Sequence, residues 1–114
     1  MISIATYAPN HQVVKQLKKY RIAKYLEEAG HELNHEQQTF IKRIESAVNS
    51  LPRQERELIE KRYLVPDSDY ITDQQIYQEE MQISYPYFRV IRERTFKKLA
   101  IILGLNKLNE KDDE

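Results

Sequence analysis

The stretch that decides the fold lies between residues 72 and 103 and has the sequence TDQQIYQEEMQISYPYFRVIRERTFKKLAIIL. Its first part predicts a short helix over residues 73–81, capped at residue 72 or 73, with a turn at residues 82–83. Ser84 then caps a last helix that continues to residue 103, with Pro86 in the first turn, where proline is tolerated. The sequence therefore predicts a short helix, a tight turn and a longer helix in succession.

The longer helix has two different faces. At helical spacing, one face carries residues that should pack on the rest of the domain, namely Phe88, Ile91, Thr95 and Leu99. On or beside the other face lie Tyr85, Tyr87, Arg89, Val90, Arg92 and Arg94. The formal net charge of the chain is +0, but residues 84–103 carry five Lys and Arg against one Glu. One basic face is enough to attract phosphate.

Upstream of this stretch, two further helices are expected. The first covers residues 34–49, begins with a capping box formed by Asn34 and Gln37, and has an apolar stripe of Phe40, Ile41, Ile44, Ala47, Val48 and Leu51. Pro52 then opens a helix that ends at residue 63. Its inward positions are Leu51, Leu58, Ile59 and Tyr63.

The two ends of the chain differ from this middle part. Residues 1–10 end in Pro9-Asn10 and are expected to form an extended leader. A helix then follows over residues 11–29 until Gly30 stops it, with its apolar positions at Val14, Leu17, Ile22, Tyr25, Leu26 and Ala29. We expect residues 1–33 to serve oligomerisation or partner contact, residues 34–105 to form the main helical domain, and residues 106–114 to be a disordered acidic tail.

Composition excludes several classes of protein. A chain of 114 residues, 40% hydrophobic and 32% charged, suits one compact folded domain or two small lobes with a shared core. With no strand pattern and no internal repeat, the expected fold class is all-α, a small helical domain with a carboxy-terminal helix-turn-helix at residues 72–103. The absence of cysteine excludes disulfides and favours a reducing cytoplasm. Residues 1–4 are too short for a signal peptide core, and no stretch approaches a membrane span.

The helix that opens at Ser84 is the candidate functional element. Placed in the major groove of DNA, its amino-terminal turns would lie closest to the base edges, and arginine offers two donors to guanine. Arg89 and Tyr87 are therefore the candidate base contacts, and the cations farther along are candidate phosphate contacts. The whole candidate set is Ser84, Tyr85, Tyr87, Arg89, Val90, Arg92, Arg94, Lys97 and Lys98. The competing interpretation is a solvated basic helix in a protein that never touches DNA.

These residues also resemble known families. Residues 51–56, with Ile59, Arg62-Tyr63 and residues 91–99, resemble the promoter-reading region four of bacterial sigma factors. The chain is more similar to the ArpU family of phage transcriptional regulators, over about residues 36–105. The matching positions are Asp73, Ile76-Tyr77, Ser84, Tyr87-Phe88-Arg89 and the run from Thr95 to Ala100.

This resemblance implies a sequence-specific regulator of phage genes, often late ones, inside a bacterial host. Double-stranded DNA is then the expected partner, and host RNA polymerase and a homodimer stay open. Two features depart from the sigma pattern. The interval from Thr72 to Ser84 is one residue longer, so that Ile76 and Tyr77 compete for one buried position. Pro86 stands where sigma factors carry a DNA-contacting side chain, so their base contacts do not transfer.

A second motif points to different chemistry. His31-Glu32-Leu33-Asn34-His35 matches the His-Glu-x-x-His pattern of zinc hydrolases, in which two histidines one helical turn apart bind the metal. The third ligand would have to be Glu55 or Glu57. Gly30 directly precedes the motif, so that a firm helix beneath the ligands is not expected. We favour two exposed histidines at a helix start, and expect no enzyme, metal or cofactor.

Three alternatives to the regulator stay open at this stage. The first is an adaptor that contacts RNA polymerase without its own operator. The second is a small terminase subunit, which shares the DNA-binding chemistry. The third, most remote, is the zinc hydrolase. The sequence leaves the operator and the choice between activation and repression undetermined.

Overall fold

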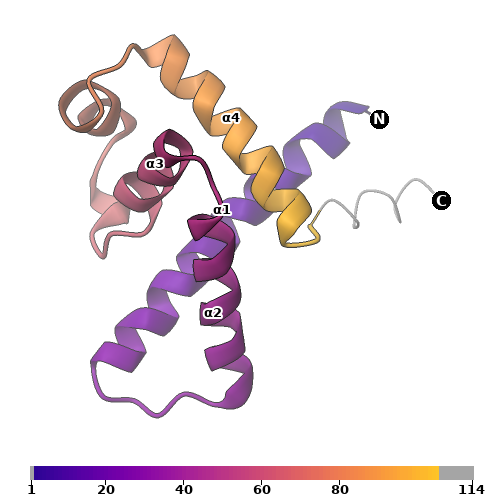
Figure 1. The fold of residues 1–114 in the computed structure, drawn as a ribbon, viewed down its shortest axis with the longest axis vertical. Coiled ribbons are helices and arrows are strands. Elements are labelled where there is room, and N and C mark those ends of the chain that lie inside the picture. Colours follow the sequence, from indigo (N-terminus) through magenta and orange to yellow (C-terminus); the bar gives the residue numbers. More distant parts are fainter. Residues whose placement is uncertain (1, 106–114) are drawn as a thin grey trace.

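The chain folds into helices joined by short connections (Figure 1). The computed structural model describes the backbone of residues 2–105 and the side chains of residues 10–105. Its elements are α1 (Ile2–Glu28), α2 (His35–Asn49), α3 (Arg53–Tyr63), the 3₁₀ turn η1 (Ser68–Tyr70), the π-helical η2 (Gln75–Glu80) and α4 (Tyr85–Ile102). No strand occurs in this part of the chain, which confirms the all-α fold class. The predicted acidic tail lies outside the described residues.

Helix α1 differs from the sequence prediction in its length. The expected extended leader is wrong for residues 2–10, which are helical and continuous with the rest of α1. A proline inside a helix removes one backbone hydrogen bond and favours a break. The turns after Pro9 are held by core packing of Val13 and Leu17, neither of which has exposed surface. Tertiary packing of this kind commonly outweighs local propensity.

The buried face of α1 was also predicted incorrectly. Val13, Leu17, Tyr20 and Ala23 form it, whereas Val14, Ile22 and Tyr25 are exposed. Leu17 is thus the one fully buried member of the predicted stripe, with Leu26 partly buried against the core. The prediction failed because two apolar faces run along α1, and spacing alone does not say which one meets the domain.

Helices α2 and α3 follow their predictions closely. Asn34 caps α2: its side chain accepts a hydrogen bond from the Gln37 backbone (2.8 Å), and the Gln37 side chain accepts one from the Asn34 backbone (2.9 Å). Pro52 immediately precedes α3. The inward residues of both helices are buried, namely Ile41, Ile44, Ala47, Val48, Leu51, Leu58, Ile59 and Tyr63, and Phe40 is partly buried against them.

One hydrophobic core joins the amino-terminal helix to the rest of the described chain. Buried side chains of α1, α2, α3, η2 and α4 belong to a single cluster. Figure 1 shows α1 passing behind α2 and α4, and α1 contacts α2, α3 and α4. Polar links reinforce this packing: the Tyr20 hydroxyl donates to Glu45 (2.7 Å), and Arg21 donates to the Tyr63 carbonyl (2.7 Å). The predicted segments 1–33 and 34–105 therefore share a core.

Candidate nucleic-acid interface

The candidate interface is built on residues 72–102, which we call the 72–102 segment. Thr72 begins it with a reciprocal cap, because its hydroxyl accepts from the Gln75 backbone (3.2 Å) while the Gln75 side chain accepts from the Thr72 backbone (2.8 Å). The chain then makes the wide turns of η2. The sequence predicted a short helix here, and the structure makes most of it π-helical.

The π-helical geometry accounts for the long interval between Thr72 and Ser84. The Met81 N–H donates to the Ile76 carbonyl (2.8 Å), five residues back, so each turn takes one residue more than an α-helical turn. Ile76 is buried, and Tyr77 is partly buried with its ring 5.6 Å from that of Phe88. The two side chains predicted to compete for one position thus pack at two different places.

The turn into α4 and the Ser84 cap lie where the sequence predicted them. Gln82 lies in the left-handed region at φ 56°, and the Ile83 N–H donates to the Tyr77 carbonyl (2.8 Å). Ser84 then caps α4, because its hydroxyl accepts from the Tyr87 N–H (3.3 Å), and Pro86 lies in the first turn. Together they form the connection between η2 and α4.

The inner face of α4 is fully buried. Phe88, Ile91, Thr95 and Leu99 have no exposed surface, as predicted. The Thr95 hydroxyl donates to the Ile91 carbonyl (2.7 Å), so its polar group is satisfied inside the core. Phe96 and Ala100 widen this face, with the Phe96 ring 5.5 Å from that of Tyr63. The helix is therefore anchored to the core from Phe88 to Ala100.

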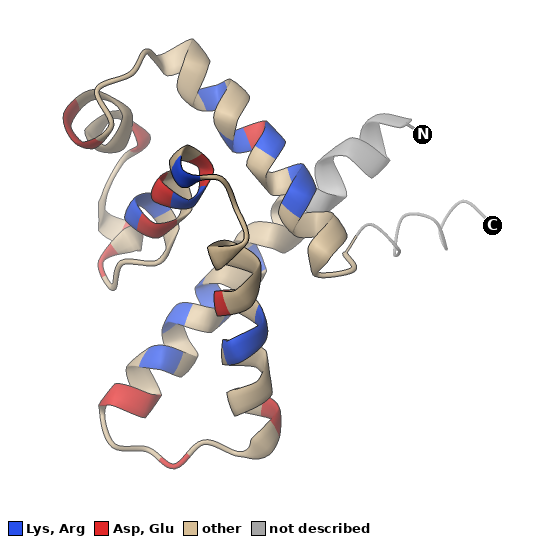
Figure 2. Ribbon diagram, viewed as in Figure 1, with Lys and Arg blue, Asp and Glu red and all other residues tan. Residues whose placement is uncertain are grey.

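The outer face of α4 carries most of the candidate residues. Tyr85, Tyr87, Arg89, Val90 and Lys97 are exposed. The Arg89 guanidinium carbon lies 5.9 Å from the centre of the Tyr85 ring, and the Tyr87 hydroxyl donates to the Gln54 side chain (3.0 Å). In the described part of the chain, none of the ion pairs includes Arg89 or Lys97. Figure 2 shows basic residues recurring along α4 with one acidic residue among them, which is Glu93.

Arg92 points elsewhere. Its guanidinium donates to the Asp73 carboxylate (2.8 Å) and to the Tyr63 hydroxyl (3.3 Å). Arg62 of α3 binds the other oxygen of Asp73 at 2.7 Å. Partial burial acts to raise the pKa of the Asp73 carboxyl, but the hydrogen bonds and charges of Arg62 and Arg92 outweigh it, and the pKa lies below its ordinary value of 3.8. Arg92 therefore joins α4 to the start of the segment.

Two other candidate cations share a buried carboxylate. Glu55 of α3 is only 3% exposed. It accepts from the Arg94 side chain (3.0 Å) and from the Lys98 ammonium (3.0 Å to both carboxylate oxygens). Since one carboxylate faces two cations, this cluster keeps one uncompensated positive charge. The Arg94 and Lys98 side chains are 51% and 43% exposed, so each still reaches solvent.

Glu55 and Asp73 bind candidate cations of α4, and the sequence analysis did not predict either contact. A signal for Glu55 exists in the sequence: it lies four residues after Leu51 and four before Ile59, on the buried face of α3. A carboxylate at such a position needs a cation beside it. The position of Glu55 on α3 therefore predicts that at least one cation of a neighbouring helix turns toward it, as Arg94 and Lys98 do.

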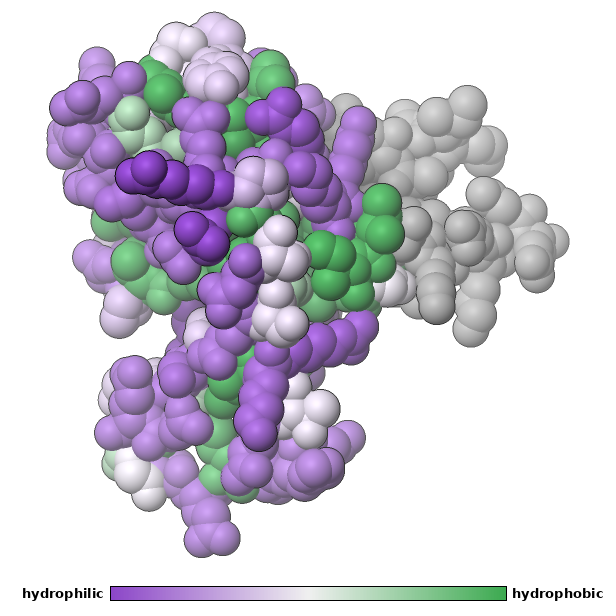
Figure 3. Space-filling model, viewed as in Figure 1, coloured by the Kyte–Doolittle hydropathy of each residue, from purple (hydrophilic) through white to green (hydrophobic). Residues whose placement is uncertain are grey.

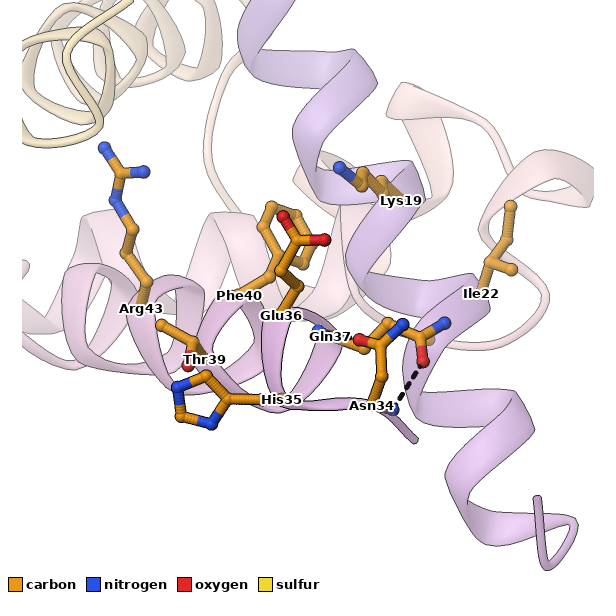
Figure 4. A pocket seen from close by; sticks show the side chains of 10 residues that line it. Lys19, Ile22, Asn34, His35, Glu36, Gln37, Thr39, Phe40 and Arg43 are labelled. Carbon is orange, nitrogen blue, oxygen red and sulfur yellow. Dashed lines mark hydrogen bonds between the residues drawn. The ribbon is translucent and has the colours of Figure 1, made fainter. Parts of the chain in front are cut away.

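The histidine motif does not have the geometry of a helical zinc site. His31 lies in the loop before α2, whereas His35 is the first residue of that helix, so the two are not one helical turn apart. Figure 4 shows His35 beside the Asn34–Gln37 cap. Both histidines are exposed. Glu55 is bound to Arg94 and Lys98, and no group of three His, Asp or Glu side chains converges in the described residues.

Comparison with models of known protein families, with curated proteins and with solved structures gives no significant match. Among the described residues, no helix combines the length and the apolar character that crossing a membrane requires.

Proposed function

We propose that this chain is a sequence-specific DNA-binding regulator of transcription, with the outer face of α4 in the major groove. The observation that carries the proposal is one face of one helix: Arg89 and Lys97 are exposed there, while Phe88, Ile91 and Leu99 anchor the opposite face. A recognition helix needs this division, because it must present donors to DNA without losing its own support.

The order of the elements supports the same proposal. The succession of a short helical element, a turn and a longer helix with an exposed basic face supports a helix-turn-helix, in which the first element would be π-helical. Arg89 lies near the amino-terminal end of α4, where such a helix comes closest to the bases. Lys97 and the cluster of Arg94, Lys98 and Glu55 lie farther along, where phosphate contacts are expected.

Assignment to phage regulators rests on the resemblance to the ArpU family and to sigma region four. Asp73, Ser84, Arg89 and Thr95 lie at matching positions. In this proposal the chain controls phage genes, often late ones, in the cytoplasm of a bacterial host, and host RNA polymerase is a further partner.

The decisive experiment is selection of a binding sequence from random double-stranded DNA, followed by titration of three variants. We expect Arg89→Ala to lower affinity for the selected sequence by about ten- to a hundredfold while changing affinity for random DNA much less. Lys97→Ala should weaken binding to both DNAs alike and reduce the salt dependence by about one phosphate contact. Lys42→Ala removes an exposed cation of α2 and serves as the control.

The outcomes separate this proposal from an adaptor that contacts RNA polymerase alone. The adaptor gains support from Arg92, whose guanidinium is bound to Asp73 rather than directed outward. If no sequence is enriched and binding does not depend on salt, DNA recognition is refuted and the adaptor is favoured. If Arg89→Ala binds the selected sequence as the unchanged chain does, the assigned recognition face is wrong.

A further inference from the structure

Helix α1 has an exposed apolar face opposite its buried one. Val14, Ile22 and Tyr25 are 38%, 54% and 69% exposed and follow one side of the helix, with Lys18 between them. Val13 and Leu17, on the other side, have no exposed surface. Single exposed apolar residues such as Val14 are ordinary on soluble proteins, whereas Ile22 and Tyr25 are two large exposed ones on adjacent turns of one helix, which indicates a contact surface.

Grooves lie on both sides of this face. One, of about 550 Å³, runs between α1 and the chain that follows α3, and Tyr25, Leu64 and Pro66 line it. The other, of about 570 Å³, lies between α1 and α2 beside Phe40. Ile22 borders both grooves, and Figure 4 shows it on α1 at the edge of the second. A ridge between two grooves is the shape that packs against another helix.

The charges along α1 indicate which helix fits. Before Ile22 the helix carries Lys15, Lys18, Lys19 and Arg21, and after it come Lys24, Glu27 and Glu28. Lys24 binds Glu27 (3.0 Å), so the acidic group left for a partner at this end is Glu28. In the described residues, neither Lys18 nor Glu28 belongs to an ion pair, and both line the groove beside Tyr25. A second copy in parallel would place like charges together. An antiparallel copy places Lys18 opposite its partner's acidic end.

We propose that α1 pairs with α1 of a second copy of this chain, antiparallel and about a twofold axis near residues 23 and 24. Ile22 of each copy then packs against Tyr25 of the other, and Lys18 faces Glu28 across both ends of the contact. Such a self-complementary patch is the ordinary form of a twofold dimer. The helix pair is small for a stable interface, so we expect a dissociation constant in the micromolar range.

The test is sedimentation equilibrium without DNA, so its outcome is independent of the proposed function. The unchanged chain should shift from monomer to dimer between low and high micromolar concentrations. Lys18→Glu and Glu28→Lys should each weaken the dimer by about tenfold or more, because the twofold axis repeats every like-charge contact. The double variant Lys18→Glu/Glu28→Lys should restore it.

A control variant on α2 tests whether the dimer contact lies on α1. Lys42→Glu makes the same charge change on α2 and should leave the dimer unchanged, and circular dichroism confirms that every variant is folded. A monomer at all concentrations, or a double variant no better than the single ones, overturns the proposal. A larger species or a dimer insensitive to Lys18 and Glu28 overturns it as well.

Discussion

Glu55 is the single residue through which α3 controls the charge of the candidate interface. Its carboxylate faces Arg94 and Lys98 at 3.0 Å. We expect Glu55→Gln, which keeps the shape and removes the charge, to raise affinity for random DNA and to steepen the salt dependence by about one contact. The ratio of specific to random binding should fall. Fluorescence anisotropy at several salt concentrations measures both quantities.

The control for this variant lies five residues farther along the same helix. Glu60 is exposed and outside the ion pairs of the described residues, so Glu60→Gln removes the same charge without releasing Arg94 or Lys98. Since these two cations are about half exposed and can return to water, Glu55→Gln should lower the free energy of unfolding by only about 1 kcal/mol. Equal DNA binding by both variants would contradict the role given to Glu55.

The candidate residues of α4 show how far helical periodicity predicts the interface. Arg89 and Lys97 were predicted to be exposed, and they are. Arg92 was grouped with them, although it lies four residues after the buried Phe88 and next to Ile91, at the edge of the inner face. Periodicity places a side chain on a face, but a long arginine at the edge takes the direction of the nearest carboxylate. That carboxylate, Asp73, is 19 residues away in the sequence.

At the scale of elements, Asp73 joins η2 to both α3 and α4. Its pKa is lowered by Arg62 and Arg92, so its ionised form stabilises the fold at neutral pH. That stabilisation is lost as the pH falls through the ordinary value of 3.8 and below, because the unfolded chain then binds a proton that the folded chain excludes. Asp73→Asn should therefore lower the free energy of unfolding by about 1–2 kcal/mol at pH 7 and by much less at pH 3.

Urea unfolding at the two pH values measures this difference. Asp67→Asn is the matched control, since Asp67 is an exposed carboxyl in the turn before η1 and takes part in none of the ion pairs of the described chain. A loss of stability by Asp73→Asn that is the same at pH 3 and pH 7 would mean that its pairing with arginine does not carry the effect.

The elements also differ in how far the sequence predicts them. Strong local signals placed α2 and α4: the Asn34 capping box and the Ser84 cap each begin a helix at the expected residue. In α1 the local signals conflict, because Pro9 favours a break and two apolar faces compete. The π-helical turns of η2 were not predicted either. Ile76 of η2 is buried in a core made largely by distant segments, which local sequence signals do not describe.

At the scale of the whole molecule, α1 has one face for folding and, in our proposal, one for association. Leu17 has no exposed surface and joins α1 to the common core. Leu17→Ala should lower the free energy of unfolding by about 2–5 kcal/mol, because it leaves a cavity where α1 meets the other helices. Chemical unfolding of dilute protein, where the monomer dominates, isolates this effect.

For Tyr25→Ala, on the opposite face of the same helix, we expect the opposite pattern, a loss of association with little loss of monomer stability. Tyr25 is 69% exposed, so its removal should change the stability of the dilute monomer by less than about 0.5 kcal/mol. At high concentration the unchanged chain is more stable against unfolding, because only the folded chain dimerises and association therefore favours the folded state. Tyr25→Ala should lose that gain, whereas Leu17→Ala should be destabilised at every concentration. If the midpoint of unfolding for the unchanged chain does not rise with concentration, α1 contributes to the fold only through its buried face.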